Sequence, residues 1–290
     1  MNRTVVINPN SRRGKEWGPH IKFECEILGV PFYEAESAED LIAKVSAAIE
    51  SGADEVWVGG GDGTIGEVFG CFVGKKTALG ILPLGTGNAL ANELGIPCDP
   101  DEIIPFLTEA TPQPIDAGKV NDRHFCTVAT LGLTTTIAET LSQQDKTKLG
   151  RFLYLPAALR SLFKPTVATC KLQSGGRRLY RGKITQLVIA NTRTHAGPFT
   201  VSEAASVSDG KLSVYWLKDS TKRAILRYVL WMVRTRNPQV PEIDTVELQR
   251  LVLSSRRKLT IVVDGDLITG KRFEFESLPS SVRVLCAPTG

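Results

Sequence analysis

The sequence predicts an α/β fold joined to a β-rich one: an N-terminal three-layer α/β domain with a parallel sheet, then a C-terminal β-rich sandwich domain. Two observations lead to this prediction. Strand-type and helix-type segments alternate over residues 1–113, which is typical of a parallel sheet covered by helices on both faces. Strand-type segments then follow one another over residues 114–290, which is typical of a sandwich. We therefore expect two domains with a boundary near residue 113.

The elements of the first domain follow from apolar runs and helix-capping signals. Short apolar runs predict strands over residues 4–8, 54–58 and 78–82. Ser37-x-x-Asp40 predicts the start of a helix that Gly52 ends, and Asp99-Pro100 predicts the start of another. Two further helices are expected after glycine-rich loops, over about residues 64–72 and up to residue 94.

The elements of the second domain follow from turn signals between β-type runs. Asn121-Asp122-Arg123 and Ser174-Gly175-Gly176 each lie between two such runs and predict hairpins. Asp264-Gly265-Asp266 predicts a third hairpin turn, between strands 259–264 and 271–276. Further strands are expected over residues 186–191, 211–217, 246–253 and 282–286, with helical interruptions over residues 149–163 and 220–236.

The composition indicates a soluble globular protein, because 42% of the 290 residues are hydrophobic and 23% are charged. The net charge of +4 is mild and no basic stripe with interleaved aromatic residues appears, so we expect no nucleic-acid partner. The six cysteines contain no C-x-x-C pair, which indicates reduced thiols, so we expect a cytoplasmic protein. No signal segment and no run of about eighteen apolar residues is present, so we expect no membrane-spanning segment.

Two glycine-rich loops follow neighbouring predicted strands: VGGGDGTIGE at residues 58–67 and LPLGTGN at residues 82–88. Backbone N–H groups at such strand-to-helix turns can hold phosphate oxygens, and glycines permit positive φ and close approach of a ligand. Asp62 is the acid inside the first loop, where it could orient a metal or a lysine for phosphoryl transfer. The alternative is structural, since Thr64 and Glu67 form a capping box. Two such loops at one sheet edge favour a nucleotide.

We expect the nucleotide to contact these loops and the end of the first strand. For Asn8 and Ser11 the alternative is a plain loop. The candidate nucleotide-binding residues are Asn8, Ser11, Gly60, Gly61, Asp62, Gly63, Thr64, Glu67, Gly85, Thr86, Gly87 and Asn88.

GGDGT followed by LPLGTGN resembles the diacylglycerol kinase/sphingosine kinase catalytic-domain family, particularly its small soluble bacterial lipid kinases. VINPNSRRGK, PIDAGKVN, AASVSDGKL and VVDGD continue the resemblance in the family's order over nearly the whole chain. The resemblance implies an ATP- and Mg-dependent kinase that phosphorylates a hydroxyl of a diacylglycerol-like lipid at a membrane surface. The resemblance is also compatible with a homodimer.

The resemblance also implies roles for two later segments. Asp209, with the carbonyls of Ser206 and Lys211, matches the family's magnesium site; the alternative is a turn before a strand. Asp266 stands where the family carries a glutamate that is proposed as the catalytic base, and the aspartate side chain is one methylene shorter. The alternative is that Asp266 only belongs to the hairpin turn. Asp266 and Asp62 are thus the candidate catalytic residues.

The lipid kinase is the first hypothesis, and three alternatives stay open. GGDGT also occurs in the related NAD kinases, so a small-molecule kinase is the second hypothesis. The aspartate at position 266 motivates the third, a catalytically weak nucleotide- or lipid-binding protein. Finally, the basic and aromatic helix predicted over residues 222–236 could lie on an anionic bilayer or pack on the β-rich domain.

Overall fold

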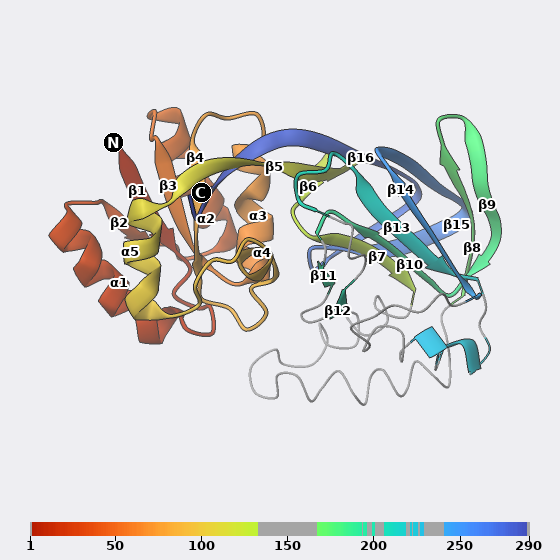
Figure 1. Ribbon diagram of the computed structural model, residues 1–290, viewed down its shortest axis with the longest axis horizontal. Coiled ribbons are helices and arrows are strands. Elements are labelled where there is room, and N and C mark those ends of the chain that lie inside the picture. The colour runs from red at the N-terminus through yellow and green to blue at the C-terminus, as the bar shows by residue number, and fades with distance from the viewer. Residues whose placement is uncertain are drawn as a thin grey trace.

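The protein consists of an α/β half and a β-rich half that lie side by side, as the sequence predicts (Figure 1). The helices α1 to α5 all lie in the N-terminal half, whereas strands form most of the C-terminal half. The computed structural model describes residues 2–132, 167–192, 194–195, 199–200, 206–218, 221, 223–225, 227–228 and 241–288.

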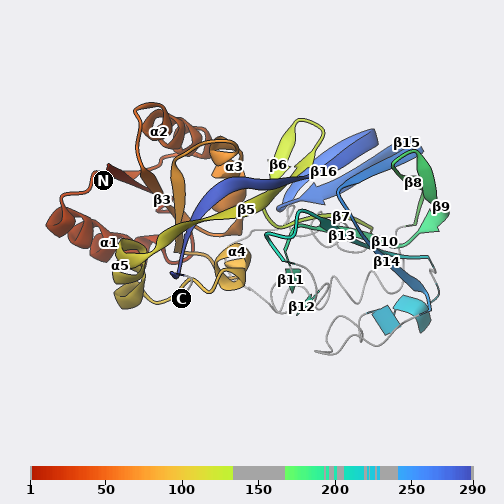
Figure 2. The ribbon, with the colours of Figure 1, turned by 45° about the horizontal axis from the view of Figure 1, so that its top comes forward.

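Four parallel strands form the sheet of the N-terminal half, in the order β2-β1-β3-β4. Figures 1 and 2 show this sheet between α1 with α5 on one face and α2 with α3 on the other, which confirms the three layers. The strands are β1 (Arg3–Ile7), β2 (Phe32–Glu34), β3 (Glu55–Gly60) and β4 (Ala78–Pro83). The helices are α1 (Gly14–Leu28), α2 (Ala38–Glu50), α3 (Asp62–Phe72), α4 (Ala89–Glu93) and α5 (Pro100–Glu109).

Two of the predicted helix starts are confirmed and one is wrong. Ser37 caps α2 by accepting a hydrogen bond from the Asp40 N–H at 3.2 Å, and Asp99 caps α5 in the same way. Helix α3 begins at Asp62, two residues before the predicted start. Thr64 therefore lies inside the helix instead of capping it, because the backbone turns into the helix directly at Gly61.

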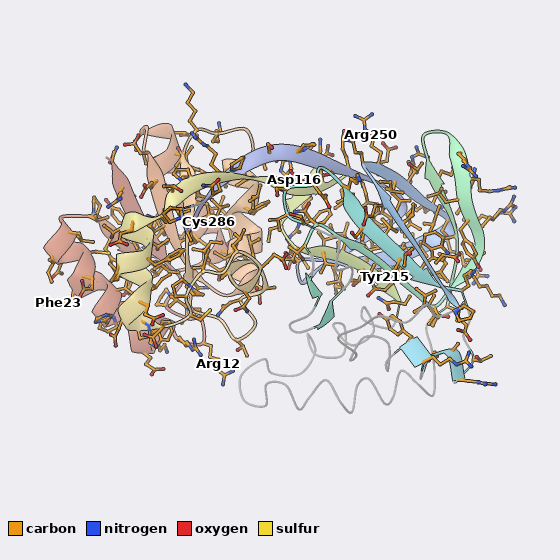
Figure 3. All side chains as sticks on the ribbon, in the orientation of Figure 1. Arg12, Phe23, Asp116, Tyr215, Arg250 and Cys286 are labelled. Carbon is orange, nitrogen blue, oxygen red and sulfur yellow. The ribbon has the colours of Figure 1, made fainter. Side chains whose placement is uncertain are left out.

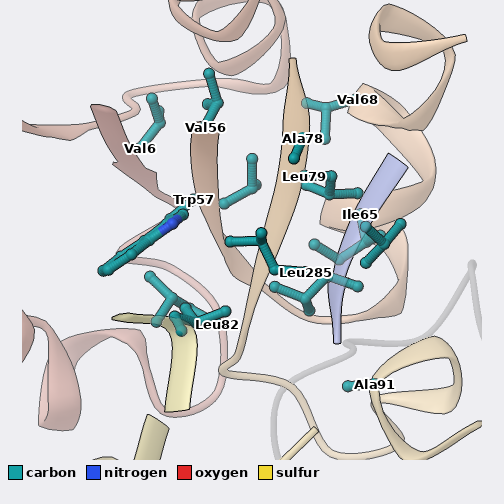
Figure 4. Packing of buried hydrophobic residues seen from close by; sticks show 14 of the residues in the cluster. Val6, Val56, Trp57, Ile65, Val68, Ala78, Leu79, Leu82, Ala91 and Leu285 are labelled. Atoms are coloured by element: carbon teal, nitrogen blue, oxygen red, sulfur yellow. The ribbon is translucent and has the colours of Figure 1, made fainter. Parts of the chain in front are cut away.

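The core of the N-terminal half is formed by strands that are buried along their whole length. Every residue of β3 and β4 is buried, which is typical of parallel strands covered on both faces. Trp57, Leu79 and Leu285 are fully buried, and Figure 4 shows them with the inward side chains of α3. Burial of each such side chain contributes about 1.5–3 kcal/mol.

The C-terminal half is built from the strands β5 to β16. Both hairpins predicted between residues 115 and 181 are confirmed, since β5 pairs with β6 and β8 pairs with β9. The strands are β5 (Thr111–Val120), β6 (Arg123–Phe125), β7 (Val128–Gly132), β8 (Ala168–Ser174), β9 (Arg177–Ile184), β10 (Gln186–Ala190), β11 (Thr194–His195), β12 (Phe199–Thr200), β13 (Leu212–Leu217), β14 (Ile243–Leu248), β15 (Arg250–Val263) and β16 (Asp266–Cys286).

Two long strands, β5 and β16, run through both halves (Figures 1 and 2). β16 pairs with β15 near its start and with β5 further along, and Val284 then pairs in parallel with Leu79 of β4. The last part of β16 thus extends the N-terminal sheet. The boundary at residue 113 stays a prediction, and the two halves share these strands.

The helical interruption predicted over residues 149–163 lies outside the described residues. Of the segment 220–236 only a part is described, and there Ala224, Ile225 and Tyr228 are buried in one cluster with Tyr215 of β13. This part of the helix packs on the β-rich half. None of the helices in the described part of the chain is long and apolar enough to cross a membrane. All six cysteines are unpaired.

Candidate active site

Three loops meet at the edge of the parallel sheet where β1, β3 and β4 end. Gly61 after β3 and Gly85 after β4 are in direct contact. A Cβ on Gly85 would lie 2.5 Å from the Gly61 Cα, and a Cβ on Gly61 would lie 3.2 Å from the Gly85 Cα. The loop after β1 joins them, because the Arg13 N–H donates to the Leu84 carbonyl at 2.9 Å. Any larger residue at position 85 would push the two glycine-rich loops apart.

Close approach, and not positive φ, explains the glycines of the first loop. Gly61 has a φ of −93°, and Gly59, Gly60 and Gly63 are also outside the left-handed region. The expectation that these glycines use positive φ is therefore wrong. A Cβ on Gly60 would lie 2.3 Å from the Thr64 Cβ, so the tight turn into α3 leaves no room for a side chain.

Asn88 holds the second loop in shape. It is buried, and its φ of 48° lies in the left-handed region that asparagine tolerates better than most residues. Its Oδ1 accepts a hydrogen bond from the Gly85 N–H at 2.9 Å, and its Nδ2 donates to the Pro83 carbonyl at 3.2 Å. The asparagine of LPLGTGN thus closes the turn that brings Gly85 against Gly61.

Asp62 links the two loops. It is the first residue of α3, and its Oδ1 accepts a hydrogen bond from the Ala89 N–H at the start of α4. A Cβ on Gly87 would lie 2.6 Å from the Asp62 Oδ2. Burial raises the pKa of the Asp62 carboxyl, the N–H groups of Ala89 and Asn88 oppose this, and the charge of Asp264 raises the pKa further.

Asp264 is the second carboxylate of the site, and the sequence analysis did not select it as a site residue. Its Oδ2 accepts from the Cys126 N–H at 2.7 Å. Its Oδ1 accepts from the N–H groups of Thr127 and Val128, both at 3.0 Å, and from the Thr127 hydroxyl. A Cβ on Gly66 would lie 3.0 Å from the Asp264 Cβ, so this hairpin residue of the β-rich half packs directly on α3.

A small cavity lies between the loops. It is lined by Gly60, Gly61, Asp62, Ile65, Ile81, Asn88, Leu90, Ala91 and Cys126. Burial, followed by the charge of Asp264, raises the pKa of the Cys126 thiol well above its ordinary range. Cys126 therefore lines the cavity as a protonated thiol and does not act as a nucleophile.

The loop after β1 contributes polar groups and one cation. The Asn8 Nδ2 donates to the Thr64 Oγ1 at 3.2 Å, and the Ser11 hydroxyl donates to the Asn8 carbonyl at 2.8 Å. The Arg12 guanidinium donates to the Thr86 Oγ1 at 3.0 Å, and Figure 3 shows Arg12 projecting from this end of the α/β half. A cation beside the second glycine-rich loop suits a phosphate ligand.

Asp266 is exposed and lies directly after the turn of the β15–β16 hairpin. Asp264 and Gly265 have φ values of 47° and 100°, as both central residues of a type I′ turn require, so the hairpin turn is confirmed. Pairing resumes at Asp266, earlier than the predicted strand at residue 271. The exposed Asp266 carboxylate forms an ion pair with Arg123. Its role as base stays a prediction.

The loop at residues 206–211 is a hydrogen-bonded turn. The Asp209 carboxylate accepts from the Ser206 N–H at 3.2 Å and from the Lys211 N–H at 2.8 Å. The buried Asp116 accepts from the Gly210 N–H at 2.6 Å, and Figure 3 places Asp116 where the two halves meet. Within the described ranges no three His, Cys, Asp or Glu side chains cluster as metal ligands.

Comparison with known proteins identifies the family. Residues 2–120 match the family described as "Diacylglycerol kinase catalytic domain", and residues 127–286 match the "YegS C-terminal NAD kinase beta sandwich-like domain". A "Probable lipid kinase YegS-like" of Klebsiella pneumoniae (strain 342) is 30% identical over 252 residues, which cover 86% of this chain and 83% of the relative. The chain belongs to the diacylglycerol kinase-like family of bacterial lipid kinases.

Further relatives agree with this assignment. A second lipid kinase relative, from Pseudomonas putida strain KT2440, is also 30% identical, over 87% of this chain and 82% of its own length. A solved structure described as a diacylglycerol kinase of Bacillus anthracis strain Sterne aligns over 99% of this chain and 97% of its own, with a TM-score of 0.77. At 17% identity that likeness shows the common fold.

The predicted site residues of the lipid kinase divide by location. The structure brings the residues of both glycine-rich loops together with Asn8 and Ser11 at one sheet edge. Glu67 lies half-buried on the second turn of α3, whereas Asp266 and the 206–211 turn lie on the β-rich half. The residues missed from the sequence are Arg12 and Asp264, although both stand inside motifs that were recognised.

Proposed function

We propose that this lipid kinase uses ATP and Mg²⁺ to phosphorylate a free hydroxyl of a diacylglycerol-like lipid. One observation supports this above the others. Two glycine-rich loops touch at Gly61 and Gly85, and the half-buried carboxyl of Asp62 lies between them at the carboxyl edge of a parallel sheet. Ligands of open α/β sheets bind at this edge, and phosphates bind to backbone N–H groups at such turns.

The donor phosphates would lie on the backbone N–H groups of the two loops. Thr86 adds a hydroxyl, and Arg12, which donates to that hydroxyl, adds a positive charge that the developing phosphoryl charge needs. Asn8 supports the first loop through Thr64 instead of reaching outward. Its role is therefore to fix the position of α3 beneath the phosphates.

The carboxylate oxygens of the site are suitable ligands for Mg²⁺, because magnesium prefers oxygen ligands. The charge of Asp264 raises the pKa of the Asp62 carboxyl, and the two carboxylates would hold the nucleotide's Mg²⁺, which neutralises phosphate charge when bound. Asp209, with the carbonyls of Ser206 and Lys211, would hold a structural Mg²⁺. The Asp209 oxygens already accept backbone N–H groups, so the loop is shaped before any ion binds.

Asp266 is the proposed acceptor of the lipid hydroxyl's proton. Arg123 contacts one of its two oxygens, Oδ2, so Oδ1 would be the atom that accepts the proton. Both side chains are partly exposed, and exposed pairs contribute about 0–1 kcal/mol, so Arg123 would hold Asp266 in place only weakly. The lipid would then approach along the β-rich half.

The decisive experiment incubates the protein with γ-labelled ATP, Mg²⁺ and a total lipid extract from the source cell, followed by mass identification of the labelled product. We expect a labelled phosphatidate-type lipid that is absent with Asp62→Ala and absent after chelation of the metal. Label transferred to added NAD would instead favour the small-molecule kinase. ATP binding without transfer to any lipid would favour the weak binding protein.

A further inference from the structure

Asp264 is held by the short segment between β6 and β7, residues 126–128. Three successive N–H groups, those of Cys126, Thr127 and Val128, all donate to its carboxylate. Successive N–H groups that point the same way bind anions, and here the anion is a side chain of the protein itself. Because peptide bonds are planar and trans, the carbonyls of the same peptide units point the opposite way and need donors of their own.

Asn191 supplies both of these donors. It follows the last residue of β10, and its backbone N–H donates to the Thr127 carbonyl at 2.8 Å. Its side-chain Nδ2 donates to the Cys126 carbonyl at 3.2 Å. Two successive peptide units therefore each have Asn191 at the carbonyl oxygen and the Asp264 Oδ1 at the N–H. A hydrogen bond at one end of a peptide unit polarises it and strengthens the bond at the other end.

The burial of Asn191 indicates that its amide nitrogen is needed at this position. The residue is 2% exposed, and Nδ2 also donates to the carbonyl of Asp116 in β5 at 3.0 Å. Within the part of the chain that the structure describes, the buried Asn191 Oδ1 has no hydrogen-bond partner. A buried acceptor without a donor destabilises a fold. The Nδ2 donor is the feature of asparagine that an apolar side chain of similar size would not replace.

We propose that Asn191 is a positioning residue for phosphoryl transfer, which holds residues 126–128 so that their N–H groups fix the Asp264 carboxylate against α3, the helix that begins at Asp62. The inference rests on the proposed function, in which these two carboxylates hold the Mg²⁺ of the nucleotide. Residues behind a metal ligand fix its orientation, and their loss typically weakens metal binding about 10- to 100-fold. Asn191 binds the carbonyl side of the peptide units and Asp264 the N–H side, so the effect passes through the peptide units.

Calorimetric titration with ADP, in the presence and absence of Mg²⁺, tests the proposal. Mg²⁺ should strengthen ADP binding by the wild type. Asn191→Ala keeps the backbone N–H but removes Nδ2, so it should reduce this metal-dependent gain about ten-fold or more, while the metal-free affinity stays within about three-fold. The matched control is Leu187→Ala, which opens a cavity in the core of the same strand, where Leu187 pairs with Leu131 and Trp216. This control should keep the wild-type gain.

A double-mutant cycle shows whether Asn191 acts through Asp264. In Asp264→Asn the negative charge is already gone, so adding Asn191→Ala should reduce the metal-dependent gain by less than about two-fold further, because residues that act through one contact are not additive. The same four proteins give a second cycle by urea unfolding, which needs no ligand. There the double variant should unfold at a higher urea concentration than the sum of the two single shifts predicts.

Three results would overturn the proposal: equal weakening of ADP binding with and without Mg²⁺ in Asn191→Ala, the same selective loss in Leu187→Ala, or additive effects in either cycle. If the wild type itself binds no ADP, with or without Mg²⁺, the proposed function fails. The unfolding cycle then still decides whether Asn191 holds Asp264 in place.

Discussion

Replacing Asp264 by alanine tests whether one carboxylate joins the two halves at the active site. The change leaves the N–H groups of Cys126, Thr127 and Val128 without their acceptor. At a partly buried site each unsatisfied donor costs about 1 kcal/mol, and an alanine at a φ of 47° adds about 1 kcal/mol. We expect a loss of about 4 kcal/mol from a total stability of about 5–15 kcal/mol.

Urea unfolding followed by circular dichroism measures this loss, and the same hairpin supplies the controls. Asp264→Asn keeps one oxygen acceptor and tolerates the left-handed backbone, so about half the loss, roughly 2 kcal/mol, is expected. Asp266→Ala removes only an exposed ion pair and should cost under about 1 kcal/mol. Equal stabilities of the two alanine variants would refute the assignment of Asp264 as the connecting residue.

Three further predictions concern catalysis. Gly85→Ala should weaken ATP binding at least about ten-fold, measured by calorimetry, because its Cβ would lie 2.5 Å from the Gly61 Cα; unchanged affinity would show that loop contact is not needed for the nucleotide. Asp264→Asn removes a charge that raises the pKa of Asp62, so Asp62 stays ionised to lower pH and the acid limb of kcat/KM should move down; a limb that stays in place contradicts the coupling. Asp266→Asn should retain ATP binding but lose turnover by roughly 100-fold, and Asp266→Glu should change the rate as well; wild-type rates in both would reduce Asp266 to a turn residue.

The sequence predicted those helices and strands that depend on short-range signals, such as capping residues and apolar runs. Ser37 and Asp99 cap their helices, and the runs that form β3 and β4 are apolar because helices cover both faces of the sheet. Helix α1 was missed, because Gly18 and Pro19 stand inside it and both disfavour a helix in sequence reasoning. The helix forms nevertheless because Trp17, Ile21 and Cys25 are buried against the sheet.

The candidate site was predicted where its geometry lies within one motif. Asn88 and Gly85 are three residues apart, so both partners of their hydrogen bond belong to the motif LPLGTGN. Asp264 differs, because its partners at residues 126–128 are more than 130 positions away. The turn has two residues with positive φ, and this distant packing places Asp264 against α3, whereas Asp266 is exposed.

The pairing of Val284 with Leu79 has a consequence for biosynthesis. β4 has β3 on one side and the last part of β16 on the other, so its second neighbour leaves the ribosome more than 200 residues later. Until then β4 presents an unpaired edge, which is a site for association with other chains. The two glycine-rich loops belong to the earliest-synthesised sheet, yet that sheet becomes complete only after the β-rich half has been translated. We expect a fragment of residues 2–120 to aggregate where the whole chain folds.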